Sequence, residues 1–216
     1  MSVNNKLIKL NGIIIGETNY KDFDKLLTVL TKERGKIKVY AFNVRRSNSK
    51  KIGTVRLFSF GEFELIEDKD SYSLQNITLK ESFDNLTLDY NNTCYAAYFI
   101  ELADYFGFEN LESEKICDLI YYTFKALVRG AVDAKLIRRV YELKMLEFQG
   151  EYKDSESLSV DNKTLKYTWD FVLNTLSKDL YTFKLSDEIY KLFDSEMSLE
   201  MRDKVGRKFK SLEEIE

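Results

Sequence analysis

The sequence predicts an α+β protein with two parts, an N-terminal five-stranded barrel and an all-helical C-terminal region. The first observation is that short alternating apolar runs, separated by turn residues, fill the first 80 positions. The second is that the apolar period changes from two to about 3.6 residues after Glu81. A chain of 216 residues with 44% apolar side chains can bury a core in each part. We therefore expect domains at residues 1–80 and 81–216.

The barrel is expected from the number and length of its strands and from the glycines within them. Gly12 and Gly16 bracket the run Ile13-Ile14-Ile15, and glycines permit a bend or bulge in a curved strand. Five short strands within about 80 residues favour a closed Greek-key barrel such as the OB-fold, with an SH3-like barrel as the rival. The expected strands cover residues 7–20, 25–31, 36–42, 58–66 and 74–80.

The helical region is expected from apolar residues at helical spacing, such as Tyr95 and Leu102. Gly107 and Gly130 are expected helix stops, because glycine commonly ends a helix. The segment 133–149 is apolar around most of its circumference, which indicates a central place in the bundle. The expected helices lie around residues 95–106, 116–127, 133–149, 165–176 and 186–209.

Charge is distributed unevenly along the chain. Residues 1–80 hold 15 Lys and Arg against 9 Asp and Glu, whereas residues 81–216 hold 18 against 27. The stretch from Arg34 to Gly61 contains no acidic residue at all. This asymmetry predicts that the first part faces a polyanion, although a basic surface also serves as a solubility device.

Residues 36–42 alternate like a half-buried strand, with Ile37 and Val39 toward the core and Lys38 and Tyr40 outward. Cations for the phosphates and flat rings for unpaired bases are what a single-stranded nucleic acid requires. A bulge that reversed the alternation would instead bury the aromatic rings in the core. The candidate nucleic-acid-binding residues are Arg34, Lys36, Lys38, Tyr40, Phe42, Arg45, Arg46, Lys50, Lys51 and Arg56.

Catalytic constellations are missing from the sequence, which has no His, no phosphate-cradling glycine motif and no Cys/His pair. Asp22, Asp24 and Lys25 imitate a nuclease cluster, but turn residues beside a strand explain them. Cys94 and Cys117 lie in apolar helical patterns, so a zinc site is not indicated and a reducing cytoplasm is the simplest compartment. Neither a signal-peptide core nor a membrane-spanning run is present. We expect a non-enzymatic binding protein without a cofactor.

Several segments form a pattern by their order and spacing. They are Gly12-Ile13-Ile14-Ile15, Asp24-Lys25-Leu26, Glu33-Arg34-Gly35-Lys36 with the later Arg45-Arg46, Glu81-Ser82-Phe83, Tyr98-Phe99-Ile100-Glu101-Leu102-Ala103-Asp104, Ala134-Lys135-Leu136-Ile137-Arg138-Arg139-Val140-Tyr141-Glu142-Leu143-Lys144 and Gly206-Arg207-Lys208-Phe209-Lys210-Ser211-Leu212. The pattern resembles the bacterial recombination-mediator family RecO and runs through nearly the whole chain. Each piece is weak alone, but several in the correct order are difficult to obtain by chance.

The resemblance implies an N-terminal OB-fold, a helical C-terminal domain and a role in RecF-pathway DNA repair. Such proteins bind single- and double-stranded DNA, anneal complementary strands, contact the C-terminal tail of single-strand-binding protein and, with RecR, help RecA to load. It also implies a cytoplasmic, nucleoid-associated protein. The alternative hypothesis is an OB-fold adaptor that binds acidic protein tails or RNA, with DNA binding incidental.

The chain departs from the family in one respect. Many members carry a four-cysteine zinc module after the central helix, whereas here Gln149-Gly150-Glu151-Tyr152 leads into a short polar stretch without such ligands. We infer that the module is absent. The resemblance also implies that the tail of single-strand-binding protein docks on the helical domain. The candidate residues for this contact are Arg129, Lys135, Arg138, Arg139 and Lys144, although a surface helix face explains them equally well.

Overall fold

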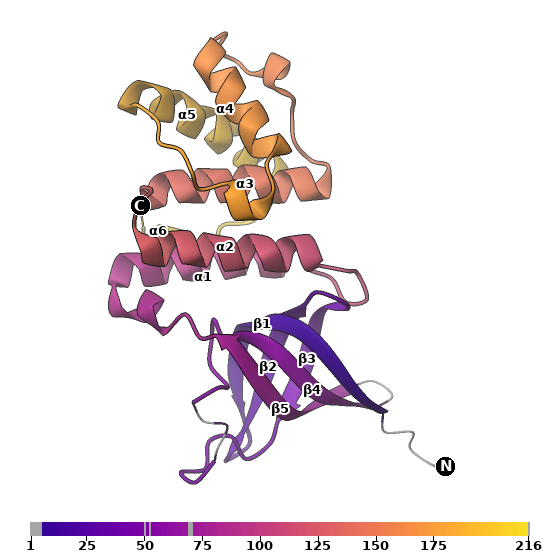
Figure 1. Cartoon of the computed structure of the whole chain (residues 1–216). Helices are drawn as coiled ribbons and strands as arrows, with labels where there is room; N and C mark the ends of the chain where they lie inside the picture. The colour runs from indigo at the N-terminus through magenta and orange to yellow at the C-terminus, as the bar shows by residue number, and fades with distance from the viewer. Residues whose placement is uncertain (1–5, 50, 52, 69–70, 216) are drawn as a thin grey trace. The chain divides into compact units, whose positions relative to one another are not determined.

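The computed structural model describes residues 6–49, 51, 53–68 and 71–215 (Figure 1). The chain divides into two compact units. The barrel unit comprises the residues up to Asn85 together with Asp104–Cys117, and the helical unit comprises Leu86–Ala103 together with the residues from Asp118 onward.

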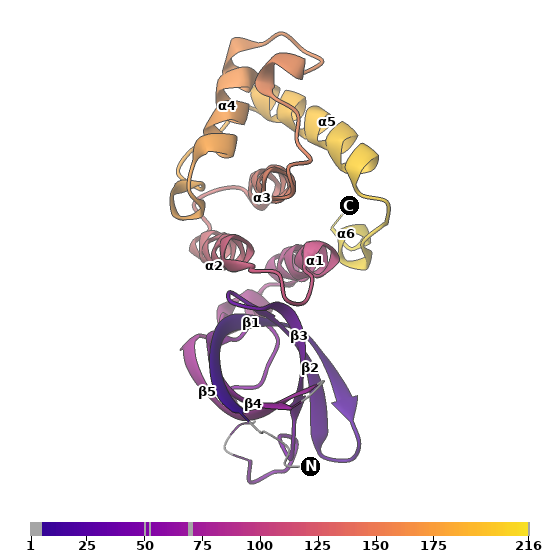
Figure 2. The same ribbon diagram turned by 90° about the vertical axis from the view of Figure 1, so that its right-hand side faces the viewer.

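Five strands close into a barrel in the order β1-β2-β3-β5-β4, and Figure 2 looks into it. Neighbours are antiparallel except β3 and β5, which run parallel where Val39 pairs with Tyr72. This order and closure confirm the predicted OB-like barrel. The strands are β1 (Lys6–Tyr20), β2 (Asp24–Thr31), β3 (Gly35–Ala41), β4 (Phe60–Asp68) and β5 (Ser71–Glu81).

Strand β1 is long enough to pair with two neighbours, β2 and β4, and it bends between them. Its register with β2 shifts between Ile14 and Gly16, which confirms the bulge expected there. Gly12 pairs with both neighbours, and a Cβ at this position would lie only 2.3 Å from the backbone oxygen of Leu30. Glycine is therefore required where the two ladders meet.

Inward residues from all five strands fill the barrel, including Ile14, Val29, Val39 and Phe63. The expected start of the fourth strand is wrong by two residues. Phe58 has a positive φ of 69° and precedes the strand, so its apolar side chain is buried from a turn rather than from a ladder.

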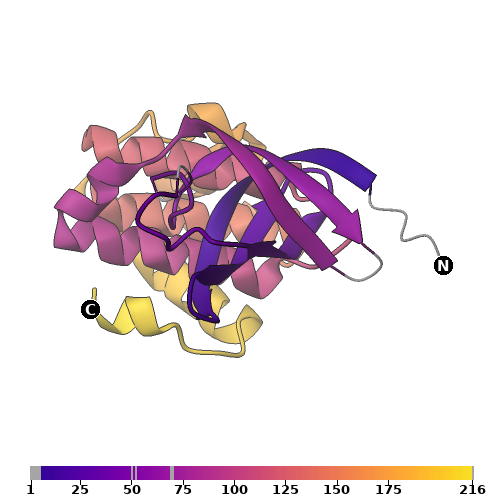
Figure 3. The ribbon, with the colours of Figure 1, turned by 90° about the horizontal axis from the view of Figure 1, so that it is seen from below.

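In the part of the chain that the structure describes, six α-helices and three short 3₁₀ helices follow the barrel strands. Helix α3 begins after the N-cap Asp133, and α5 begins after the N-cap Ser186. Helix α5 ends at Lys204, earlier than expected, and an extended stretch then leads to the short helix α6 (Figure 3). The helices are η1 (Asp84–Leu88), α1 (Tyr90–Phe106), α2 (Glu114–Arg129), α3 (Ala134–Gln149), η2 (Ser155–Ser157), α4 (Lys163–Asn174), η3 (Ser177–Asp179), α5 (Asp187–Lys204) and α6 (Lys210–Glu213).

Helix α3 occupies the centre of the helical unit, as its sequence predicts. Figure 2 looks along α1, α2 and α3, with α4 and α5 on the far side of α3 from α1 and α2. The continuous run from Leu136 to Leu146 is buried. Beyond α3, the buried Trp169 of α4 packs edge-on against Phe193 of α5, with ring centroids 5.6 Å apart.

Candidate nucleic-acid interface

Strand β3 presents one face to the barrel core and the other to solvent. Ile37 and Val39 are buried, whereas Lys38 is exposed and Tyr40 is half-buried. Phe42, one residue beyond the strand, is 47% exposed. The alternation is therefore uninterrupted, and both aromatic rings lie on the outside of the barrel rather than in its core.

Three aromatic rings meet on this outer face. The Tyr40 ring lies 5.3 Å from that of Tyr20 and 6.1 Å from that of Phe42, centroid to centroid, and the Tyr40 and Phe42 planes differ by only 8°. Tyr20, the last residue of β1, reaches Tyr40 across β2, because Thr18 pairs with Leu26 and Leu26 pairs with Tyr40. We call Tyr20, Tyr40 and Phe42 the ring cluster.

The coil that follows β3 folds back onto the β1–β2 turn. The backbone N–H of Asn43 donates to Asp24 Oδ1 at 2.7 Å, and that of Arg45 donates to the Phe23 oxygen at 3.0 Å. The guanidinium carbon of Arg46 lies 5.0 Å from the centre of the exposed Phe23 ring, a cation–π contact. These contacts hold both arginines beside the outer end of β3.

Four cations of this surface have no carboxylate partner among the residues that the structure describes. Lys21 Nζ lies 5.2 Å from the Tyr20 ring centre, and Lys38 Nζ donates to Thr28 Oγ1 at 2.6 Å. Arg45 Nη1 donates to a backbone oxygen of the β1–β2 turn at 3.2 Å. Because these contacts neutralise no charge, the positive charge is available to an anion. We call Lys21, Lys38, Arg45 and Arg46 the open cations.

Two other candidate cations are engaged by carboxylates of the barrel unit. Lys36 Nζ lies 3.2 Å from Asp104 Oδ1 and also donates to the Asp104 backbone oxygen at 2.7 Å. Arg56 Nη2 lies 3.1 Å from Asp84 Oδ2. Their charges are partly offset within the protein, so they are weaker candidates for phosphate binding.

Lys51 is drawn toward the barrel rather than toward solvent. Its Nζ donates to the Leu74 backbone oxygen at 3.1 Å, and burial lowers the pKa of this ammonium. The neighbouring candidate Lys50 lies outside the described residues.

Arg34 is tied to the barrel by a bidentate ion pair with Glu67, in which Arg34 Nη2 lies 3.3 Å from Glu67 Oε2. Arg34 Nη1 also donates to the Tyr72 hydroxyl at 3.1 Å. The hydrogen bond from Arg34 lowers the pKa of the Glu67 carboxyl, and its two partners raise the pKa of Arg34. Arg34 thus joins the β2–β3 turn to β4 and β5.

The Arg34–Glu67 pair predicts a pH-dependent contribution to stability. Because the folded-state pKa of Glu67 is lowered, its contribution is present above the unfolded-state pKa of roughly 4.3 and is lost as the pH falls below it. We expect the difference in unfolding free energy between the wild type and Glu67→Gln to shrink from about pH 6 to pH 3. Urea unfolding followed by circular dichroism measures it, and a difference independent of pH would contradict this assignment.

The five candidate partner-binding residues differ in burial. Arg129 and Lys135 are exposed, whereas Arg138, Arg139 and Lys144 are buried. Lys144 Nζ donates to a backbone oxygen of α4 at 2.7 Å. A solvent-facing helix surface therefore does not account for the three buried residues.

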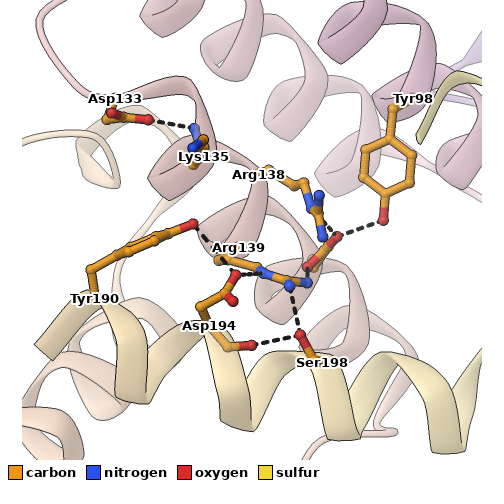
Figure 4. Close-up of polar contacts among 9 residues, drawn as sticks. Tyr98, Asp133, Lys135, Arg138, Arg139, Tyr190, Asp194 and Ser198 are labelled. Carbon is orange, nitrogen blue, oxygen red and sulfur yellow. Dashed lines mark hydrogen bonds and ion pairs between the residues drawn. The ribbon is translucent and has the colours of Figure 1, made fainter. Parts of the chain in front are cut away.

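Arg139 forms the centre of a buried polar network between α3 and α5 (Figure 4). Its Nη1 lies 2.8 Å from Glu142 Oε2, its Nε 2.6 Å from Asp194 Oδ1, and its Nη2 donates to Ser198 Oγ at 2.6 Å. Burial lowers the pKa of Arg139, but the two carboxylates outweigh it and hold that pKa above its ordinary value. Glu142 is only 1% exposed and also accepts from the Tyr98 hydroxyl at 2.6 Å. The Glu142 carboxylate is therefore buried rather than solvated.

A cavity of about 570 Å³ lies beside this network, within the helical unit. Its basic lining includes Arg138, Arg139, Arg207 and Lys208, and its apolar lining includes Val205, Phe209 and Leu212. Arg138 and Arg139 are held by the Glu142 carboxylate, whereas Arg202, Arg207 and Lys208 of the lining are exposed.

Comparisons with known proteins cover both units. A family model described as "Recombination protein O N terminal" matches residues 1–83, and "Recombination protein O C terminal" matches residues 87–194. A DNA repair protein RecO of Caldicellulosiruptor saccharolyticus is 30% identical over 204 residues, which cover 93% of this chain and 79% of that protein. The chain belongs to the RecO family of DNA repair proteins.

Other RecO relatives match shorter stretches. The DNA repair protein RecO of Caldicellulosiruptor bescii is 37% identical over 145 residues, which cover 67% of this chain and 59% of that protein. That of Alkaliphilus metalliredigens is 29% identical over 165 residues, 76% of this chain and 67% of that protein. The match to the first of these spans less than two thirds of the relative's length.

In this RecO chain a salt-bridge network follows the central helix. Lys153 Nζ lies 2.8 Å from Glu196 Oε2 and 3.2 Å from Glu200 Oε1, which holds the segment after α3 to α5. Cys94 and Cys117 are both buried and are not joined in a disulfide. Within the described ranges, no group of three or more His, Cys, Asp or Glu side chains is arranged to hold a metal ion. Among these same residues, no helix is sufficiently long and apolar to traverse a lipid bilayer.

The sequence prediction omitted three residues of this RecO surface, Tyr20, Lys21 and Phe23. Lys21 and Phe23 lie in the β1–β2 turn, and Tyr20 ends β1 beside it. The available signal is a pair of aromatic residues flanking Lys21 and Asp22, at a turn where small polar residues are usual. In OB-folds this turn and the strand 2–3 face are the common ligand-binding elements.

Proposed function

We propose that this RecO family member is a non-enzymatic recombination mediator in RecF-pathway DNA repair, which binds single- and double-stranded DNA through its barrel. The observation that supports the proposal most directly is the group of open cations beside exposed aromatic rings on the outer face of β3. In this proposal residues 1–80 form the nucleic-acid-binding domain, and residues 81–216 form the helical domain.

The open cations act on DNA by neutralising phosphates and releasing condensed counterions, which gives affinity without sequence readout. The same effect promotes strand annealing, because a cationic surface offsets the repulsion between two phosphate backbones and raises their rate of encounter. No bond is made or broken in this process, so no cofactor is required.

The protein partners in this proposal are RecR, with which the chain assists RecA loading, and the C-terminal tail of single-strand-binding protein. The cavity lined by basic and apolar residues of the helical unit fits an acidic tail that ends in apolar side chains. Of the five candidate partner residues, Arg138 and Arg139 line this cavity. We place the protein in the cytoplasm, associated with the nucleoid.

The proposal predicts that affinity for single-stranded DNA falls steeply with salt. With about four to six phosphates neutralised, the slope of log affinity against log salt is expected to be roughly −3 to −4. Fluorescence anisotropy of a labelled oligonucleotide at a series of salt concentrations measures the slope. A response independent of salt would exclude the cationic surface as the source of affinity.

Alanine variants test whether the DNA-binding site lies on the barrel. Replacing Lys38, Arg45 and Arg46 by Ala together is expected to make the slope less negative by about 2 and to lower affinity at low salt. The matched control replaces three exposed lysines of the helical unit, Lys163, Lys178 and Lys191, which changes the net charge equally. Equal losses of DNA affinity in both triple variants would show that the barrel cations are not the specific site of DNA binding.

The second candidate function is an OB-fold adaptor whose basic face binds acidic protein tails or RNA, with DNA binding incidental. The open cations support it as well, because they recognise negative charge rather than a particular polyanion. A competition experiment distinguishes the adaptor function from the DNA-binding function. If an acidic peptide or an RNA displaces labelled DNA at concentrations where unlabelled DNA does not, the adaptor function is the better description.

A further inference from the structure

We propose that the ring cluster selects unpaired DNA, with bases of a single strand stacking on Tyr20, Tyr40 and Phe42. This inference rests on the proposed DNA binding and goes beyond it, because it assigns part of the affinity to bases rather than to phosphates. It adds Tyr20 as a specificity-determining residue.

The outer rings of the ring cluster are exposed to solvent. Phe42 is 47% exposed and Tyr20 is 36% exposed, whereas the aromatic residues Phe63 and Tyr72 of the same barrel are buried in its core. Adjacent exposed aromatic residues on a soluble protein mark a binding surface. Each base of a nucleic acid offers a flat face to such a ring, and stacking tolerates any sequence.

The rings of the cluster are spaced more widely than stacked bases. The centroids of neighbouring rings lie 5.3 and 6.1 Å apart, whereas successive bases in a duplex strand are spaced by about 3.4 Å. Bases that follow the rings must therefore spread apart, which an unpaired strand permits and a stacked duplex does not. A duplex can use only the open cations.

Positive charge lies next to the rings. Lys38 precedes Tyr40 by two residues on the same face of β3, and Lys21 lies over the Tyr20 ring. Arg46 is four residues beyond Phe42 and packs on Phe23 of the β1–β2 turn. Rings flanked by cations suit a strand whose phosphates run alongside its exposed bases.

The test compares three probes of one length: oligothymidylate, an abasic oligomer with the same phosphates but no bases, and a duplex. We expect the wild type to bind oligothymidylate roughly 10-fold or more tightly than the abasic oligomer. Tyr20→Ala and Phe42→Ala should each weaken oligothymidylate binding about 5-fold or more while changing abasic binding less than about twofold. Phe42→Tyr, which keeps a flat ring, should retain the preference, whereas Phe42→Leu should lose it.

Two controls separate this inference from the proposed function. Tyr167→Ala removes an exposed tyrosine of the helical unit and should leave all three affinities unchanged. Lys38→Ala should weaken binding to all three probes. Equal wild-type affinity for oligothymidylate and the abasic oligomer would overturn the stacking proposal but leave cation-driven DNA binding intact. Binding to none of the probes would overturn both.

Discussion

Replacing Arg139 by alanine is expected to lower the unfolding free energy of the helical unit by about 3–5 kcal/mol. The side chain is 7% exposed and joins Glu142 of α3 to Asp194 and Ser198 of α5. Its loss would leave the buried Glu142 carboxylate without one of its cationic partners. Removing the guanidinium leaves a buried charge that is only partly compensated. The resulting loss of unfolding free energy is larger than the contribution of an exposed ion pair.

The stability of the helical unit in the Arg139→Ala variant can be followed through Trp169, which is the single tryptophan of the sequence and is fully buried in this unit. Urea unfolding followed by its fluorescence reports that unit. Arg129→Ala is the matched control, since Arg129 is exposed at the end of α2 and should change stability by less than about 1 kcal/mol. Equal stability of the wild type and Arg139→Ala would show that the network contributes nothing.

Replacing Gly35 by alanine is expected to destabilise the barrel unit by about 2–4 kcal/mol. Gly35 begins β3 with a φ of 65°, a conformation that L side chains rarely adopt. A Cβ there would also lie 2.0 Å from the Phe108 backbone oxygen and 2.4 Å from that of Leu111. Backbone atoms cannot move aside as the end of a side chain can, so segment 108–111 would have to shift.

Two other glycines separate the cost of the positive φ from the cost of the steric overlap. Gly130 has a φ of 64° but open space around it, so Gly130→Ala should cost only about 1 kcal/mol, the conformational part. Gly53 has neither feature, and Gly53→Ala should be nearly neutral. Hydrogen exchange over β2 and β3 measures the barrel variants, and Trp169 fluorescence measures Gly130→Ala. A Gly35→Ala loss no larger than that of Gly130→Ala would contradict the predicted overlap.

Much of the fold could be predicted because its signals are local. The alternation of residues 36–42, the glycines of β1 and the apolar run of α3 each depend on neighbours within a few positions. The errors occurred where local apolar character misled, at Phe58 before β4 and after Lys204 at the end of α5. In both places an apolar residue is buried from outside a regular element.

The candidate site was less predictable than the fold. Arg34 and Lys38 are equivalent in a charge count, yet Arg34 is held by Glu67 while Lys38 has no carboxylate partner among the described residues. Tyr20 joins the ring cluster only because β1, β2 and β3 pair in one register. The β1–β2 turn is therefore identified as part of the candidate site by the pairing of the strands and not by a pattern in its own sequence.

Residue periodicity and composition are enough to predict the barrel, the helical region, the basic stretch and the outward face of β3, because both are properties of neighbouring positions. Which cations remain available to a ligand depends on contacts that exist only in the folded protein. Arg34 meets a carboxylate 33 positions away, Lys36 one 68 positions away and Arg139 one 55 positions away. Such pairs form only when the barrel closes and the helices pack, since an ion pair depends on distance in space and not along the chain.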